Sequence, residues 1–149
     1  MTGAHLSQES IPEFLERFLG FEDGVITNIS IFLPRGDRAA RTIEVEVQAL
    51  DRTSQGEGGA NSRLFGWKLV RIAMRGMTEY RLAESLAYPL QVLSDGLKIG
   101  YEDGLFTLDL DPGPDEWSAR SIHDAANSYS KQYILSRDCS FEVLDGPFI

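Results

Sequence analysis

The feature that most constrains the fold is a strict alternation over residues 41–51, RTIEVEVQALD. Apolar residues occupy each odd position from 43 to 49, and polar residues occupy the even positions between them. Successive side chains of a strand point to opposite faces of its sheet. The pattern therefore predicts a strand with one buried face and one face in water, as in an antiparallel sheet.

Further segments extend this sheet. Residues 29–33 and 67–75 alternate in the same way, with Gly76 as a bulge or bend. Between them, residues 52–63 are polar and rich in glycine, which predicts a long hairpin loop. Asp-Gly pairs at 95–96 and 103–104 separate short alternating runs, which predicts a meander of three strands, because glycine accepts the positive φ of tight turns. Residues 131–136 and 139–144 predict two more strands.

A short helix precedes the sheet, in SQESIPEFLERFLG, residues 7–20. Ser10 is the expected N-cap, Pro12 lies in the first turn, and Gly20 is suited to end the helix. Between them, apolar residues recur at helical spacing. A second helix is expected over residues 121–129, with Ser121 as its cap.

These elements predict one domain, residues 1–149, because a chain of this length fits a single core. The fold class expected is α+β. The N-terminal helix packs on a curved, mainly antiparallel sheet of about seven or eight strands, arranged as a half-barrel or a sandwich.

Charge and composition limit the partners. The formal net charge is −9, which argues against nucleic-acid binding. No apolar run approaches the ~18 residues of a membrane-spanning helix, so no membrane partner is expected. The start of the chain lacks the basic and apolar regions of a secretory signal, and the single cysteine, Cys139, cannot form an internal disulfide. Together these features favour a cytoplasmic protein.

The sequence predicts no catalytic residue, no metal and no cofactor. Neither Asp95 nor Asp103 begins a register with the ligand spacing of an EF-hand. His and Cys are too few for an ordinary zinc site. A nucleophilic pair of Cys139 and His123 would form only if the fold brought them together. Trp67 and the arginines of its strand form either a solvated face of the sheet or a site that binds a protein, with the arginines as a polar rim around an aromatic anchor.

The pattern from Phe21 to Leu110 resembles a known kind of protein. It runs through FEDGVITNISI, WKLVRIAMRGMTEYRL and LQVLSDGLKIGYEDGLFTLDL. This order resembles the small β-rich immunity proteins encoded beside bacterial polymorphic toxins. The resemblance implies a non-enzymatic inhibitor that binds one cognate toxin. It carries over no binding residues, because these families have no fixed binding motif.

We therefore expect a non-enzymatic binding protein, in which an acidic surface occludes the basic active site of a toxin. Residues 90–116 hold seven acidic residues and one lysine. The partner-binding residues expected from this stretch are Asp103, Asp109, Asp111, Asp115 and Glu116. The alternative is a small-molecule-binding domain, with a pocket between the helix and the curved sheet.

Overall fold

The computed structural model describes residues 3–54, 66–87, 89–114, 116–123 and 132–144. Its strands are β1 (Ala4–His5), β2 (Gly24–Phe32), β3 (Thr42–Leu50), β4 (Trp67–Arg81), β5 (Val92–Leu93), β6 (Lys98–Glu102), β7 (Leu105–Asp109) and β8 (Tyr133–Leu144). The α-helices are α1 (Ile11–Arg17) and α3 (Ala119–His123), and the 3-10 turns are η1 (Leu19–Phe21), η2 (Arg38–Ala40) and η3 (Arg52–Ser54).

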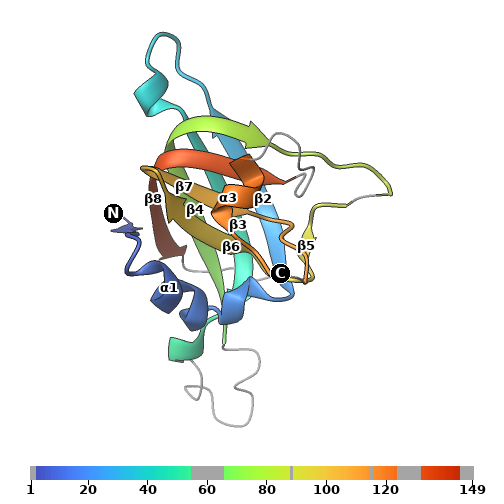
Figure 1. Cartoon of the computed structure of the whole chain (residues 1–149). Coiled ribbons are helices and arrows are strands. Elements are labelled where there is room, and N and C mark those ends of the chain that lie inside the picture. The colour runs from blue at the N-terminus through green and yellow to red at the C-terminus, as the bar shows by residue number, and fades with distance from the viewer. Residues whose placement is uncertain (1–2, 55–65, 88, 115, 124–131, 145–149) are drawn as a thin grey trace.

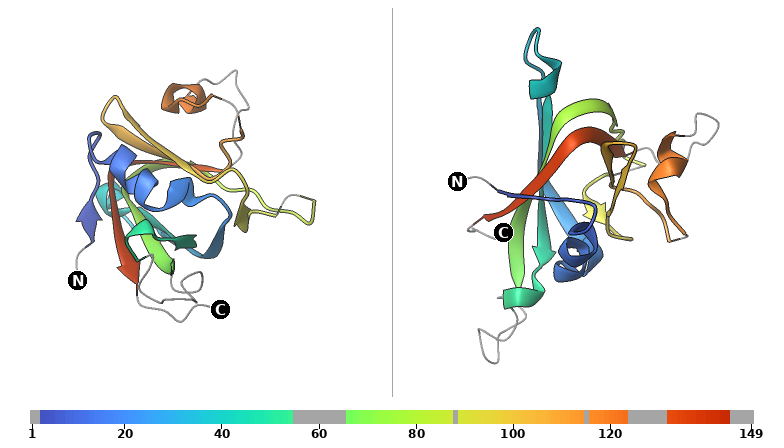
Figure 2. Two further views of the ribbon diagram at one scale, coloured as in Figure 1. Left: turned by 90° about the horizontal axis from the view of Figure 1, so that it is seen from below. Right: turned by 60° about the vertical axis from the view of Figure 1, so that its left-hand side comes forward.

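One antiparallel sheet contains all eight strands, in the order β5-β2-β3-β4-β8-β7-β6, with β1 paired to β8. The long strands β4 and β8 curl, so that the β6–β7 hairpin lies across from β2 and β3 (Figure 1, Figure 2). The fold is thus a curled antiparallel half-barrel, which confirms that part of the prediction. The α+β class is not confirmed, because the chain is mostly strand and α1 has only 7 residues.

Two features of the sheet follow the sequence pattern, the alternation on β3 and the glycine within β4. On β3, burial alternates along the whole strand as predicted, with Ile43, Val45 and Val47 fully buried. Gly76 has a φ of +71° inside β4, and the pairing of β4 with β8 shifts register just after it. A glycine with positive φ bends a strand without strain, so Gly76 gives the bend of the predicted 'bulge or bend', whereas the register shift itself falls at Thr78.

Aromatic rings fill the space beside α1. Phe14 of α1 and Phe141 of β8 have ring centroids 4.4 Å apart. Phe18 and Phe21 complete the cluster, with their own centroids 5.1 Å apart, and both are almost fully buried. These four rings occupy the place where the alternative prediction put a ligand pocket between the helix and the sheet.

Local details at the N-terminal helix differ from the prediction. Pro12 lies in the first turn as expected, but the Ser10 side chain makes no capping hydrogen bond. Its hydroxyl instead accepts a hydrogen bond of 2.8 Å from the Ser7 amide. The helix ends at Arg17 because Leu19, Gly20 and Phe21 take left-handed backbone angles in η1.

The C-terminal region was predicted as two strands and is one. β8 is continuous from Tyr133 to Leu144, and the polar residues Arg137 and Asp138 lie exposed at its centre. The expected helix over residues 121–129 is described only as α3, which ends at His123, and the rest of that prediction lies outside the described residues. The hairpin between β3 and β4 is confirmed by their pairing, whereas most of its predicted loop lies outside the described part.

Candidate functional site

The acidic stretch is divided by the hairpin that it encodes. Asp103 and Gly104 form the turn between β6 and β7, with φ of +54° and +80°, which confirms the predicted Asp-Gly turn. Asp95 precedes β6, and Asp111 follows β7. Because the two strands are antiparallel, Asp95 and Asp111 lie together at the end of the hairpin opposite Asp103.

Asp109 differs from its acidic neighbours. It is fully buried, although the sequence-based prediction placed it on an acidic binding surface. Its carboxylate accepts hydrogen bonds from the Trp117 indole, at 2.8 Å, and from the Asp111 amide, at 2.9 Å. Asp109 therefore cannot belong to an exposed acidic surface and serves to hold the chain after β7. The segment that covers it, around Trp117 and Ala119, also packs against Gly100 of β6.

The remaining predicted binding residues have different positions. Asp111 and Glu116 are exposed. Asp115 lies outside the described residues. Next to Asp103, Glu102 forms an ion pair of 2.6 Å with Arg120 of α3, so the end of the hairpin with Asp103 also carries a cation. The structure thus brings together Asp111 and Asp95, of which Asp95 was left out of the sequence-based site.

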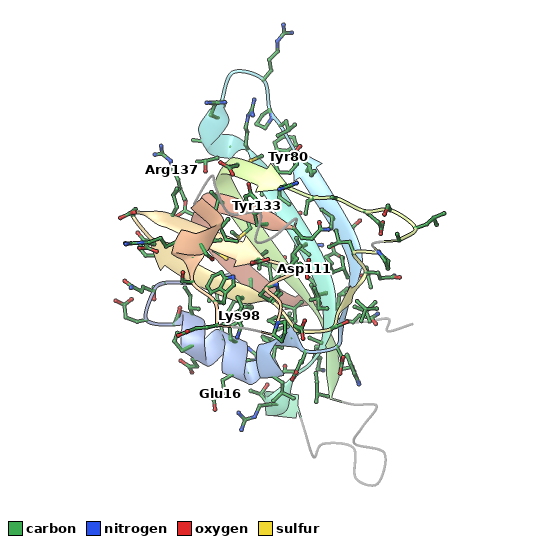
Figure 3. The ribbon with its side chains drawn as sticks, turned by 45° about the vertical axis from the view of Figure 1, so that its right-hand side comes forward. Glu16, Tyr80, Lys98, Asp111, Tyr133 and Arg137 are labelled. Atoms are coloured by element: carbon green, nitrogen blue, oxygen red, sulfur yellow. The ribbon has the colours of Figure 1, made fainter. Side chains whose placement is uncertain are left out.

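Asp95 and Asp111 line a pocket of about 160 Å³. Its apolar wall comes from Leu90, Val92 and Leu110, of which Val92 is 54% exposed. The other polar wall is Gln132, which is buried and exchanges two hydrogen bonds with the backbone of Ala83. Asp111 is labelled in Figure 3. Neither aspartate side chain pairs with a cation in the described part of the chain.

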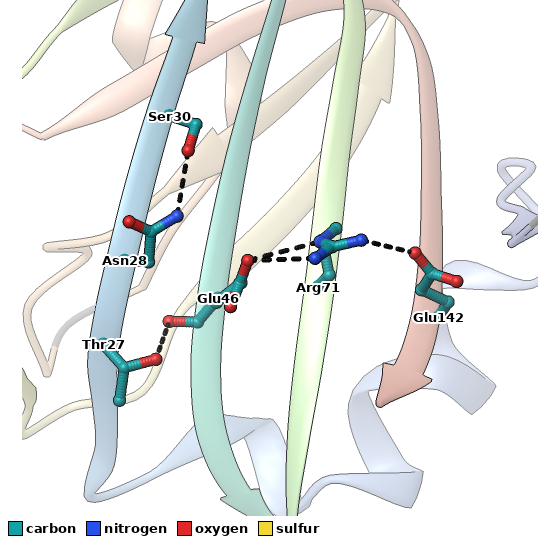
Figure 4. Close-up of polar contacts among 6 residues, drawn as sticks. All are labelled: Thr27, Asn28, Ser30, Glu46, Arg71 and Glu142. Carbon is teal, nitrogen blue, oxygen red and sulfur yellow. Dashed lines mark hydrogen bonds and ion pairs between the residues drawn. The ribbon is translucent and has the colours of Figure 1, made fainter. Parts of the chain in front are cut away.

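Arg71, which the sequence placed on a possible protein-binding rim, forms ion pairs within the sheet. The Arg71 guanidinium donates to Glu142 at 2.9 Å and to Glu46 at 3.2 Å (Figure 4). These three residues come from β4, β8 and β3 and are directly opposite one another. This ion-pair row ties three strands on the outer face of the sheet. Arg75, further along the same face of β4, remains exposed.

A second pocket, of about 260 Å³, lies where the β2–β3 connection meets the bends of β4 and β8. Its charged lining consists of Arg38, Arg41 and Arg137. The rest of the lining consists of Ala39 and of Gly76, Met77 and Thr78 of β4. Sequence reasoning missed this pocket, because the three arginines come from segments about 100 residues apart and no local pattern joins them.

Burial raises the pKa of the Cys139 thiol to about 12, with a smaller contribution from the adjacent Asp138 carboxylate. The thiol is therefore protonated at neutral pH, whereas a nucleophilic cysteine acts as the thiolate. Cys139 packs within the hydrophobic core, opposite Met74 of β4. The side chain of its suggested partner, His123, lies outside the described residues.

Replacing Cys139 with serine should lower the free energy of unfolding by about 1–2 kcal/mol, because a hydroxyl would be buried where the thiol is. Urea denaturation measures this change. In the unmodified protein, a thiol reagent should label Cys139 only at the rate of unfolding. Rapid labelling of the folded protein would contradict this description of the thiol.

Two general properties complete the site. Among the described residues, no three His, Cys, Asp or Glu side chains gather as they would around a metal ion. In the same part of the chain, none of the helices has the length and apolar character that crossing a membrane requires.

Comparisons with protein-family models, with curated protein sequences and with solved structures found no match to this chain.

Proposed function

We propose that this chain is a non-enzymatic binding protein that takes a lysine or arginine side chain of a basic protein partner into the pocket of Asp95 and Asp111. The observation that carries the proposal is the pocket itself. Two exposed carboxylates from different segments converge there without a cationic partner in the described residues. The apolar wall of Leu90, Val92 and Leu110 suits the aliphatic stem of a long cationic side chain, whose charged end the carboxylates would receive.

The particular form that we favour is toxin immunity. A toxin with a basic active site would present the complementary charge, and this chain carries a net charge of −9 that would speed the encounter. Inhibition would follow from occlusion of the active site. This form rests on the resemblance in sequence pattern described above and on the acidic pocket.

The first experiment uses a probe of known composition. Titration of the labelled protein with a short peptide containing one arginine should move NMR signals of residues 89–96 and 110–112. Replacing both Asp95 and Asp111 with asparagine should weaken this binding about tenfold or more, since a hydrogen bond to a charged group contributes about 1.5–3 kcal/mol. The backbone amide of Asp111, which bonds Asp109, is retained in that variant.

A matched control changes the same number of charges at the other end of the hairpin. Glu102→Gln with Asp103→Asn should weaken binding by less than about threefold, through long-range charge alone. With a basic toxin as partner, association rates of the pocket variant should also depend less steeply on salt than those of the unchanged protein. Equal losses in the two double variants would show that the pocket is not the binding site.

A further inference from the structure

We infer that the pocket of Arg38, Arg41 and Arg137 binds the phosphate group of a small phosphorylated molecule. The inference does not depend on the proposed function, since this pocket is formed by other elements. Arg38 belongs to η2, Arg41 lies between η2 and β3, and Arg137 belongs to β8. Figure 3 shows Arg137 on the side of the molecule toward η2.

Charge is the first argument. The chain as a whole is strongly acidic, yet the charged residues that line this pocket are all arginines. No ion pair joins any of the three to a described acidic residue. The acids nearest in sequence, Asp37 and Asp138, are not part of the lining. Like charges that gather without counter-charges cost free energy, which an anionic ligand would offset.

An unused donor is the second argument. The Nε atom of Arg41 is buried and has no hydrogen-bond partner among the described residues. A buried donor without an acceptor loses its hydrogen bond to water and gains none in return, so such groups are uncommon in native proteins. A turn of the Arg41 side chain, which lines the pocket, would bring this donor to an oxyanion there and supply its acceptor. Arginine is suited to this task because its planar fork donates two parallel hydrogen bonds to phosphate or carboxylate oxygens.

The backbone around the pocket is fixed by hydrogen bonds, which is the third argument. The Met77 amide donates to the Arg41 carbonyl at 2.9 Å and holds this segment against β4. Asp37 accepts a hydrogen bond of 3.1 Å from the Ala39 amide and so orders η2. At Gly76, a Cβ atom would lie 3.2 Å from the Cβ of Arg137. The glycine therefore allows β8 to approach β4 closely on one side of the pocket.

The ligand class follows from charge and size. A phosphate monoester carries a charge of about −1.5 to −2 and three strong acceptor oxygens, whereas a carboxylate carries one charge and two oxygens. Three guanidinium groups match the phosphate better. The volume of about 260 Å³ is below the range typical of drug-sized ligands, so the molecule attached to the phosphate is small.

The test is titration with inorganic phosphate and with glycerol phosphate, followed by NMR at a constant ionic strength set with chloride. Both ligands should produce saturable shifts in residues 38–41, 76–78 and 137. Acetate at the same ionic strength should bind at least about tenfold more weakly. No saturation with either phosphate compound below about 10 mM would overturn the inference, since that limit corresponds to binding weaker than about 3 kcal/mol. Equal binding of acetate would overturn the phosphate assignment.

Variants locate the ligand. Arg41→Gln and Arg137→Gln should each weaken phosphate binding about tenfold or more, because each removes a charge-assisted hydrogen bond. The matched control is Arg35→Gln, which removes the same charge from the same hairpin at an exposed position outside the pocket. It should weaken binding less than about threefold. If Arg35→Gln weakened phosphate binding as much, the inference would be overturned, because general attraction to positive charge would then explain the binding. If Arg41→Gln fails to fold, the exposed Arg137 provides the deciding variant.

Discussion

Replacing Asp51 with asparagine should lower the free energy of unfolding by about 2–4 kcal/mol at neutral pH. Asp51 is almost fully buried at the end of β3, and its two oxygens receive the Arg17 guanidinium at 3.1 and 3.0 Å. The Thr53 amide and hydroxyl donate to the same carboxylate at 2.9 and 2.7 Å. The two bonds from Arg17 tie α1 to the end of β3, and those from Thr53 hold the turn that follows it, so their loss loosens the helix that carries the buried Phe14.

The same residue should give a characteristic pH dependence. Burial by itself would raise the pKa of the Asp51 carboxyl, but the hydrogen bonds from Arg17 and Thr53 outweigh it, and the pKa is lowered. A lowered pKa in the folded state stabilises the protein above the pKa of the unfolded chain, about 3.9. This contribution is lost as the pH falls through the folded pKa. The difference in stability between the unchanged protein and Asp51→Asn should therefore shrink below about pH 4.

Urea denaturation of both proteins between pH 7 and pH 2 measures this difference. Glu16→Gln is the control, because it removes a carboxylate that pairs with Arg52 at 3.0 Å on an exposed surface. An exposed pair contributes less than about 1 kcal/mol, so this variant should unfold almost as the unchanged protein does. A difference for Asp51→Asn that stays constant or grows toward pH 3 would contradict the description of the Asp51 site.

The sequence predicted those features of the fold that depend on consecutive residues. The burial of β3 and the turn at Asp103-Gly104 were predictable, because alternation and turn chemistry are properties of consecutive residues. The α+β class is not confirmed, because the apolar helical spacing that predicted a longer helix continues through Leu19, whereas left-handed angles end α1 at Arg17. β8 was split in two because its exposed polar centre looks like a turn. That centre lies where β8 passes the Gly76 bend of β4.

The candidate sites were harder to predict, because each joins distant segments. The sequence placed Asp111 in an acidic surface, and the predicted hairpin implied that Asp95 lies near it, but Leu90 and Gln132 join their pocket from more distant segments. The arginine pocket joins η2 to β8, and no spacing rule connects them. For Asp109, a weak signal existed. Gly100 in the middle of β6 is typical of a place where another segment approaches a strand closely, and Trp117 does so there.

Asp109 and Asp111 therefore allow a direct comparison of a buried and an exposed carboxylate two positions apart. Replacing Asp109 with alanine should lower the free energy of unfolding by about 2–4 kcal/mol, because it leaves the Trp117 indole and the Asp111 amide without their acceptor and opens a cavity. Replacing Asp111 with alanine should change it by less than about 0.5 kcal/mol, since that side chain is exposed. Urea denaturation, followed by circular dichroism, compares the two variants.

Tryptophan fluorescence gives an independent readout in a background where Trp67, the other tryptophan, is replaced by phenylalanine. Asp109→Ala should shift the Trp117 emission toward that of a solvated indole, and Asp111→Ala should leave it unchanged. Equal stabilities and equal spectra would contradict the buried position of Asp109. The pair also separates binding from folding, because a loss of partner binding in Asp111→Ala reports on the acidic pocket. A loss of partner binding in Asp109→Ala would instead have an indirect cause. Without the Asp109 carboxylate, the segment after β7 is no longer anchored, and this segment contains Asp111.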